Sequence, residues 1–122
     1  MTKNWTDVMG WTDFAGLYSQ MVNEFESGTF VEIGSFMGKS AALMGQLIKE
    51  SGKDLKLVAI DLFPTIQELD IFASIGAGQG SPFDGESKYI RELPKSLLDT
   101  FVENMRDCGV EDYIIPVKSN SH

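Results

Sequence analysis

The chain has 122 residues, of which 43% are hydrophobic, and it carries a formal net charge of −8 at pH 7. This length and composition predict one globular domain, residues 1–122, with a packed core and no low-complexity segment. The acidic surplus argues against nucleic acid as a partner, because a phosphate backbone would be repelled and the basic residues form no run.

No stretch is long and apolar enough to cross a membrane, and the first residues lack the pattern of a secretory signal. The single cysteine, Cys108, cannot form an internal disulfide, and only His122 is available to activate it, so we expect a small packed residue. These features predict a cytoplasmic protein with no membrane partner.

The first half of the chain alternates helical and strand patterns. Apolar residues recur at helical spacing over 12–26, after Thr12 as a plausible N-cap. A short run at 29–33, apolar apart from one glutamate, predicts a strand covered on both faces of a parallel sheet. A helix over 38–51 and a strand over 56–60 follow.

The second half contains a long insertion, 64–93, between two regular elements. A short helix at Gln67–Ile75 is expected within it, and the glycine cluster Gly76–Gly80 indicates a flexible tip. Loops of this length at the carboxyl edge of a sheet often contact substrate or act as lids, which is our expectation here. A helix over 94–108, with Pro94 in its first turn, and a strand over 113–118 complete the pattern.

The glycine turn after the first strand is the strongest functional signal. Gly34 and Gly38 permit positive φ angles and the close approach of a ligand to the backbone. The amides of Gly38, Lys39 and Ser40 at the helix start favour an anionic oxygen. Asp61, at the end of the second strand, can accept two hydrogen bonds from a vicinal diol such as ribose.

The spacing of this turn separates three kinds of site. A P-loop needs four residues between its glycines, and here there are only three, so Lys39 is not expected to bind phosphate and should lie along the exposed side of the helix start. A dinucleotide fingerprint needs outer glycines where this chain has Glu32 and Met37. The segment VEIGSFMGKSA, followed by AIDLF, instead resembles the first motif and the acidic second strand end of class I S-adenosylmethionine (SAM)-dependent methyltransferases.

The resemblance covers roughly Trp11 to His122, and it implies the amino-terminal half of that family's fold. The implied fold class is α/β, a Rossmann-like three-layer sandwich with parallel strands, as in a truncated class I methyltransferase core. In the family the glycine turn lies under the amino acid part of SAM, Glu32 reaches toward its ammonium group, and Asp61 holds the ribose hydroxyls. The implied cofactor-binding residues are Glu32, Gly34, Ser35, Phe36, Gly38, Lys39, Ser40, Asp61, Leu62, Asn120, Ser121 and His122.

The implied function is methyl transfer from SAM to a small-molecule acceptor, by this chain or by an enzyme of which it is the cofactor-binding half. No catalytic residue and no metal ligand is identified. The alternatives are a SAM-binding or assembly module without transfer and, through Gly38-Lys39-Ser40, a nucleotide-binding protein. The absence of a fourth strand predicts an open edge at Phe30, Val31 and Ile33, and hence a homo-oligomer or a separate carboxyl-terminal partner.

Overall fold

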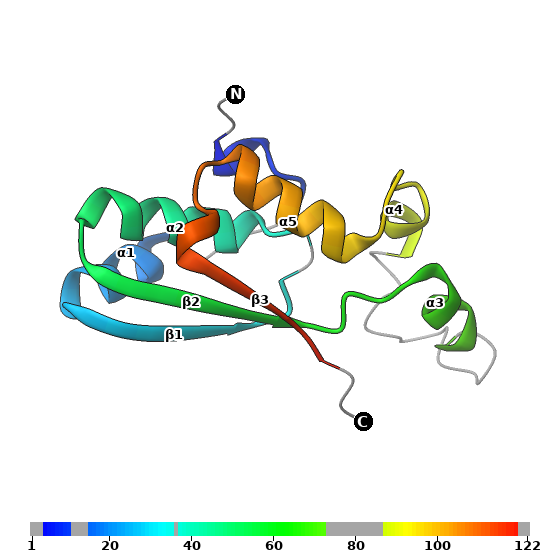
Figure 1. Cartoon of the computed structure of the whole chain (residues 1–122), viewed down its shortest axis with the longest axis horizontal. Helices are drawn as coiled ribbons and strands as arrows, with labels where there is room; N and C mark the ends of the chain where they lie inside the picture. The colour runs from blue at the N-terminus through cyan, green and yellow to red at the C-terminus, as the bar shows by residue number, and fades with distance from the viewer. Residues whose placement is uncertain (1–3, 11–14, 36, 73–86, 120–122) are drawn as a thin grey trace.

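The computed structural model describes residues 4–10, 15–35, 37–72 and 87–119. Its centre is a parallel sheet of strands β1 (Ser27–Ile33), β2 (Asp54–Asp61) and β3 (Ile114–Lys118), in the order β1-β2-β3 (Figure 1). The predicted α/β class with parallel strands is therefore confirmed, and the open sheet is compatible with a Rossmann-like fold.

Three longer helices lie on one face of this sheet: α1 (Ala15–Glu24), α2 (Lys39–Ser51) and α5 (Leu97–Asp107) (Figure 1). Two shorter helices, α3 (Ile66–Phe72) and α4 (Ser87–Arg91), follow the carboxyl end of β2, and single 3₁₀ turns form at Trp5–Asp7 (η1) and Glu111–Tyr113 (η3). None of the described helices has the length and apolar character needed to cross a membrane.

Several element bounds differ from the predicted ones, and tertiary contacts explain the differences. Strand β2 begins at Asp54 and not at 56, because Asp54 pairs with Ser27 of β1. Helix α5 begins only at Leu97, since the Ser96 hydroxyl accepts a hydrogen bond from the Asp99 amide as its N-cap. The prediction that Pro94 starts this helix is wrong.

The remaining differences concern helices. Helix α3 ends at Phe72 within the described residues, and α4 was not predicted at all because its five residues show no periodic pattern. The described part of the first helix ends at Glu24, where the chain turns toward β1. Thr12 and the glycine cluster Gly76–Gly80 lie outside the described residues.

The core lies between the sheet and helices α2 and α5. Met44 and Ile48 of α2, Leu57 of β2 and Phe101 of α5 are each at most 1% exposed. Full burial of such a side chain stabilises a fold by about 1.5 to 3 kcal/mol, so this layer holds the strands and helices together. Cys108 is partly buried against the same core, which agrees with the prediction that it is a small packed residue.

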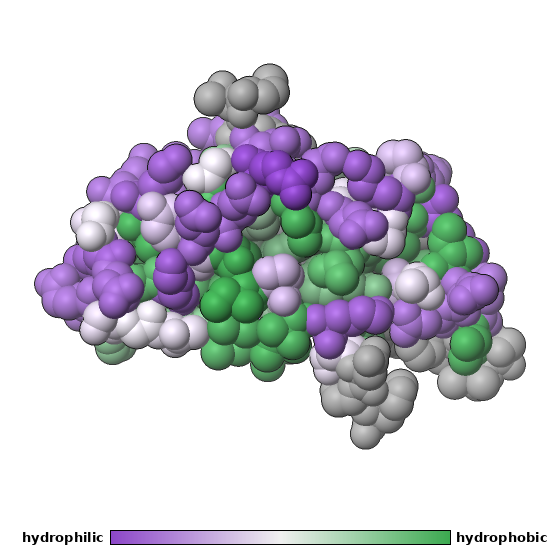
Figure 2. Space-filling view, viewed as in Figure 1, coloured by the Kyte–Doolittle hydropathy of each residue, from purple (hydrophilic) through white to green (hydrophobic). Residues whose placement is uncertain are grey.

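The other face of the sheet is not covered by any described element. Val31 and Ile33 of β1 are 59% and 83% exposed, and Ile115 and Val117 of β3 are 47% and 39% exposed. The register aligns these residues in two rows across the sheet, and Figure 2 shows hydrophobic residues at the surface over this part of the molecule. In the described residues the architecture therefore has two layers, with no second helical layer. The prediction that β1 is covered on both faces is wrong, because Val31 and Ile33 are exposed.

Candidate functional site

The glycine turn connects β1 to α2 at the carboxyl edge of the sheet. Gly34 and Gly38 have φ angles of 85° and 97°, a region that side chains with a Cβ rarely adopt. The Gly34 amide donates to the Ile60 carbonyl at 2.8 Å, and the Gly38 amide donates to the Ser35 carbonyl at 2.9 Å. The expectation of a free Gly38 amide is therefore wrong, because that amide closes the turn.

The turn is packed tightly against helix α5. A Cβ at Gly38 would lie 2.6 Å from Met105 Cε and 2.8 Å from Phe101 Cδ2. The buried Asn104 side chain donates from Nδ2 to the Met37 carbonyl at 2.9 Å. Asn104 was not predicted as a site residue, although a polar residue beside the apolar stripe of this helix is a usable signal.

Glu32 is the most unusual side chain at the site, because it is a carboxylate only 8% exposed. Its Oε2 accepts a hydrogen bond from the Tyr18 hydroxyl at 2.6 Å, and its Oε1 accepts one from Ser35 Oγ at 3.0 Å. Among the described residues, no Lys, Arg or His forms an ion pair with it. The Glu32 charge is thus held in a fixed, buried position by neutral hydroxyl donors.

Tyr18 was predicted only as part of an apolar helical face. In the structure its hydroxyl fixes Glu32, and burial, followed by the hydrogen bond and charge of Glu32, raises the pKa of Tyr18 above its ordinary value. The phenol therefore stays protonated and remains a hydrogen-bond donor to the carboxylate through the neutral pH range.

Asp61 connects the glycine turn to the end of β2. Its Oδ2 accepts a hydrogen bond from the Ser35 amide at 2.8 Å, and its Oδ1 accepts a longer one from the Phe63 amide at 3.4 Å. Ser35 thereby contacts both carboxylates, Glu32 through its hydroxyl and Asp61 through its amide. These two amides hold the Asp61 carboxylate beside the glycine turn, at the carboxyl end of β2.

Lys39, at the start of α2, points toward the amino-terminal segment. Its Nζ donates to the carbonyls of Thr6 and Val8 at 3.2 and 3.1 Å and lies 5.6 Å from the centroid of the Trp5 ring. The prediction that Lys39 lies along the exposed side of the helix start is wrong, because its ammonium turns to the amino-terminal segment. Its ammonium holds residues 4–10 against the start of α2.

The segment after Asp61 is held in place from β3. Lys118 Nζ donates to the carbonyls of Leu62 and Phe63, at 2.7 and 3.0 Å, and to Glu68 Oε1 at 3.1 Å. Phe63 has a φ of 43° yet is only 2% exposed, and its ring packs edge-on against Phe101 at 5.3 Å between centroids. The sequence contains no local signal for these long-range contacts of Lys118.

The predicted site residues are therefore partly gathered in one place. Hydrogen bonds connect Glu32, Ser35 and Asp61, and Gly34 and Gly38 shape the backbone between them. The amides of Lys39 and Ser40 belong to the first turn of α2, where backbone N–H groups have no partner within the helix. Leu62 offers a carbonyl that Lys118 already occupies.

Four predicted residues, Phe36, Asn120, Ser121 and His122, lie outside the described residues. Within the part of the chain that the structure describes, no three His, Cys, Asp or Glu side chains cluster as metal ligands would.

Comparisons with models of protein families, with curated proteins and with solved structures find no match for this chain.

Proposed function

We propose that this chain binds SAM at the carboxyl ends of β1 and β2, and that it is a small-molecule methyltransferase or the cofactor-binding half of one. The observation that carries the proposal is the buried Glu32 carboxylate, which has hydroxyl partners but no cationic partner among the described residues. A buried charge is costly without an opposite charge, and the ammonium group of SAM would supply one.

The rest of the turn is consistent with the same ligand. Positive φ angles at Gly34 and Gly38 let the backbone approach the amino acid part of SAM closely. The Ser35 amide holds Asp61 at the carboxyl end of β2, the position from which an acidic side chain binds ribose hydroxyls in Rossmann-like sites. The two carboxylates would then bind two different parts of one ligand.

Ligands with phosphate groups fit this site less well. The cation that a P-loop would direct at a phosphate, Lys39, is engaged with the carbonyls of Thr6 and Val8. An anionic ligand would also lie near the buried charge of Glu32, where the repulsion is poorly screened. We therefore rank the nucleotide-binding alternative below SAM.

The chemistry that SAM supplies is a methyl group on a sulfonium. Bound SAM would supply this methyl group to the oxygen of an acceptor hydroxyl and would leave as a neutral thioether, while the hydroxyl proton would pass to solvent at the mouth of the site. The protein's part is to align the two reactants and exclude water, which needs no dedicated base. We assign no catalytic residue.

Isothermal titration calorimetry with SAM, its demethylated product, ATP and NAD tests the proposal. SAM and its product should bind, and ATP and NAD should not. Glu32→Gln should weaken SAM binding about tenfold, because it removes the charge but keeps a hydrogen-bonding group. Glu50→Gln, an exposed change on α2, is the matched control and should bind like the unchanged protein. Equal affinity in both variants would contradict the role of Glu32.

The second candidate, an assembly module, rests on the sheet. Strand β1 pairs with β2 alone among the described strands, so its outer edge offers unpaired backbone groups beside the exposed Val31 and Ile33. We expect a second copy of the chain to pair with this edge. Sedimentation equilibrium at micromolar concentration should then give a dimer, whereas a folded species of 13.5 kDa would contradict the expectation.

A further inference from the structure

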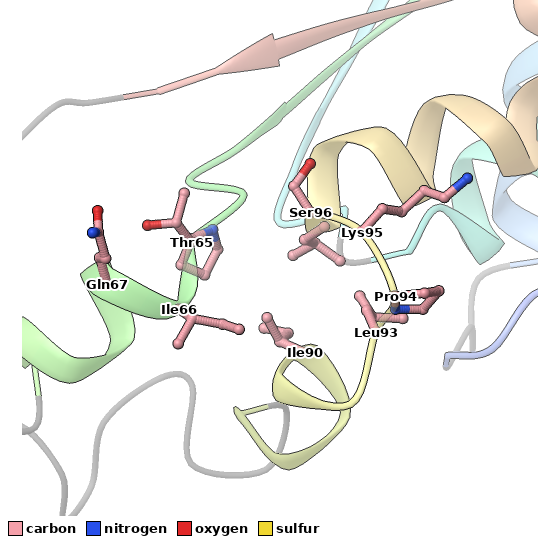
Figure 3. A pocket seen from close by; sticks show the side chains of 10 residues that line it. Thr65, Ile66, Gln67, Ile90, Leu93, Pro94, Lys95 and Ser96 are labelled. Atoms are coloured by element: carbon pink, nitrogen blue, oxygen red, sulfur yellow. The ribbon is translucent and has the colours of Figure 1, made fainter.

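A cavity of about 340 Å³ lies between the segment that follows β2 and the segment that leads into α5 (Figure 3). One wall is the segment 64–67, which follows β2, and the other is Ile90 together with 93–97, which leads into α5. Figure 3 shows Ile66 and Ile90 pointing toward one another across it. The volume is near the lower end of the range for small-molecule pockets and leaves room for roughly ten water-sized groups.

The inner surface of this pocket is apolar and carries no charge that is free to meet a ligand. Ile90 and Leu97 are 3% and 1% exposed, and none of the residues that line the pocket is acidic. The only lysine in the lining, Lys95, is turned along α5, where its Nζ lies 2.5 Å from Glu103 Oε2 (Figure 3). A neutral, mainly apolar molecule therefore fits the interior, and an ionised one would lose its hydration without gaining a partner.

The rim of the pocket adds two hydroxyl groups. Thr65 Oγ1 accepts a hydrogen bond from the Glu68 amide at 3.1 Å, and Ser96 Oγ accepts one from the Asp99 amide at 3.0 Å. Each hydroxyl thus acts as the N-cap acceptor of its helix, and Figure 3 shows the Ser96 oxygen directed away from Ile66 and Ile90. A methyl acceptor needs a nucleophilic atom, and a neutral hydroxyl on an apolar body meets that need without placing a charge in the pocket.

The walls are preformed and connected to the cofactor site. Thr65 and Glu68 cap each other at the start of α3, and Lys118 holds the carbonyls of Leu62 and Phe63. The same short segment runs from Asp61 directly into the pocket wall at Pro64. The pocket wall therefore begins shortly after Asp61, the carboxylate expected to hold the ribose, and the hydrogen bonds from Lys118 fix the segment between them.

We propose that this pocket binds the methyl acceptor, and that the acceptor is a neutral, mainly apolar small molecule with a hydroxyl group. The acceptor role rests on the proposed function, whereas the binding of neutral apolar molecules rests on the pocket alone. The two parts can therefore fail separately.

Amide chemical-shift titrations of the full chain test the pocket, with p-cresol as the neutral probe and benzoate as an anionic probe of similar size. p-Cresol should cause saturable shifts at 65–67 and 95–97 with a dissociation constant in about the millimolar range, and benzoate should not. Ile66→Glu places a charge at the pocket mouth, on a side chain that is 47% exposed, and should weaken p-cresol binding roughly tenfold. Ile71→Glu, on the same helix, 56% exposed and outside the lining, should leave it unchanged.

If p-cresol causes no shifts at these amides, or binds the two variants equally, then this pocket does not bind neutral apolar molecules as proposed. A parallel titration with SAM should shift the amides of Gly34 and Ser35. Binding of p-cresol without SAM would keep the pocket and overturn its acceptor role. Binding of SAM without p-cresol would leave the proposed function standing and overturn this inference.

Discussion

The glycine at position 38 combines two constraints that other glycines of this chain carry separately. Gly34 has a φ of 85° but open space where a Cβ would be, so Gly34→Ala tests backbone strain alone. Gly45, inside helix α2, would bring a Cβ within 2.7 Å of Val110 Cβ, so Gly45→Ala tests packing alone. Gly38 has a φ of 97°, and a Cβ there would also lie within 3.0 Å of Phe101 and Met105.

The expected losses of unfolding free energy follow from these contacts. Gly34→Ala should cost about 1 to 2 kcal/mol, the penalty for a Cβ in the left-handed region. Gly45→Ala should lose about 1 to 3 kcal/mol to overpacking but regain nearly 1 kcal/mol from alanine's better helix propensity. Gly38→Ala should lose about 2 to 5 kcal/mol, because strain and overpacking add and the Phe101 ring cannot move aside easily.

Urea denaturation followed by circular dichroism measures all three variants on one scale. Gly38→Ala should be the least stable of the three variants. If it unfolds at the same urea concentration as Gly34→Ala, then α5 does not press on the turn as the structure describes. The turn would then be free to change shape around a ligand.

Three further predictions concern the side chains around the turn. Asp61→Ala should weaken SAM binding by about 1 to 3 kcal/mol by calorimetry, through loss of charge-assisted hydrogen bonds, and unchanged affinity would remove the ribose assignment. Tyr18→Phe should destabilise the fold by about 1.5 to 3 kcal/mol at neutral pH, because Glu32 loses a donor. Because the pKa of Tyr18 is raised in the folded state, its contribution to the free energy of unfolding is full below about pH 10 and falls as the pH rises above that value. The free energy of unfolding from urea titrations should therefore fall less steeply with alkaline pH in Tyr18→Phe than in the unchanged protein. An equal fall in both proteins would contradict this. Lys39→Met should speed amide hydrogen exchange at residues 4–10, because it removes the hydrogen bonds to Thr6 and Val8. ATP should bind neither the variant nor the unchanged protein. Magnesium-dependent ATP binding that the variant loses would restore the phosphate hypothesis.

The order of the elements around the glycine turn could be predicted because each has a local cause. The helical spacing of Met44 and Ile48, and Gly52 in the left-handed conformation at the end of α2, are properties of neighbouring residues. The positive φ angles of Gly34 and Gly38 follow equally from residue type. The short helix α4 escaped prediction because a segment of five residues has too little pattern to detect.

The partners of the site residues could not be predicted, because they come from distant parts of the chain. Tyr18 is 14 residues from Glu32, Asn104 is 67 from Met37, and Lys118 is 56 from Leu62. Hydrogen bonds of this range depend on how helices pack and strands align, and no local spacing encodes them.

The sequence by itself determined which segments of this protein become strands, helices and the glycine turn, and it brought an acidic residue to the end of each of the first two strands. Local periodicity and the conformational freedom of glycine are sufficient for that. Only the tertiary structure decided that the aliphatic residues Val31 and Ile33 of β1 face outward, and that Glu32 is buried. The physical reason is that an alternating or continuous apolar strand has two faces, and which of them is covered depends on where the helices dock.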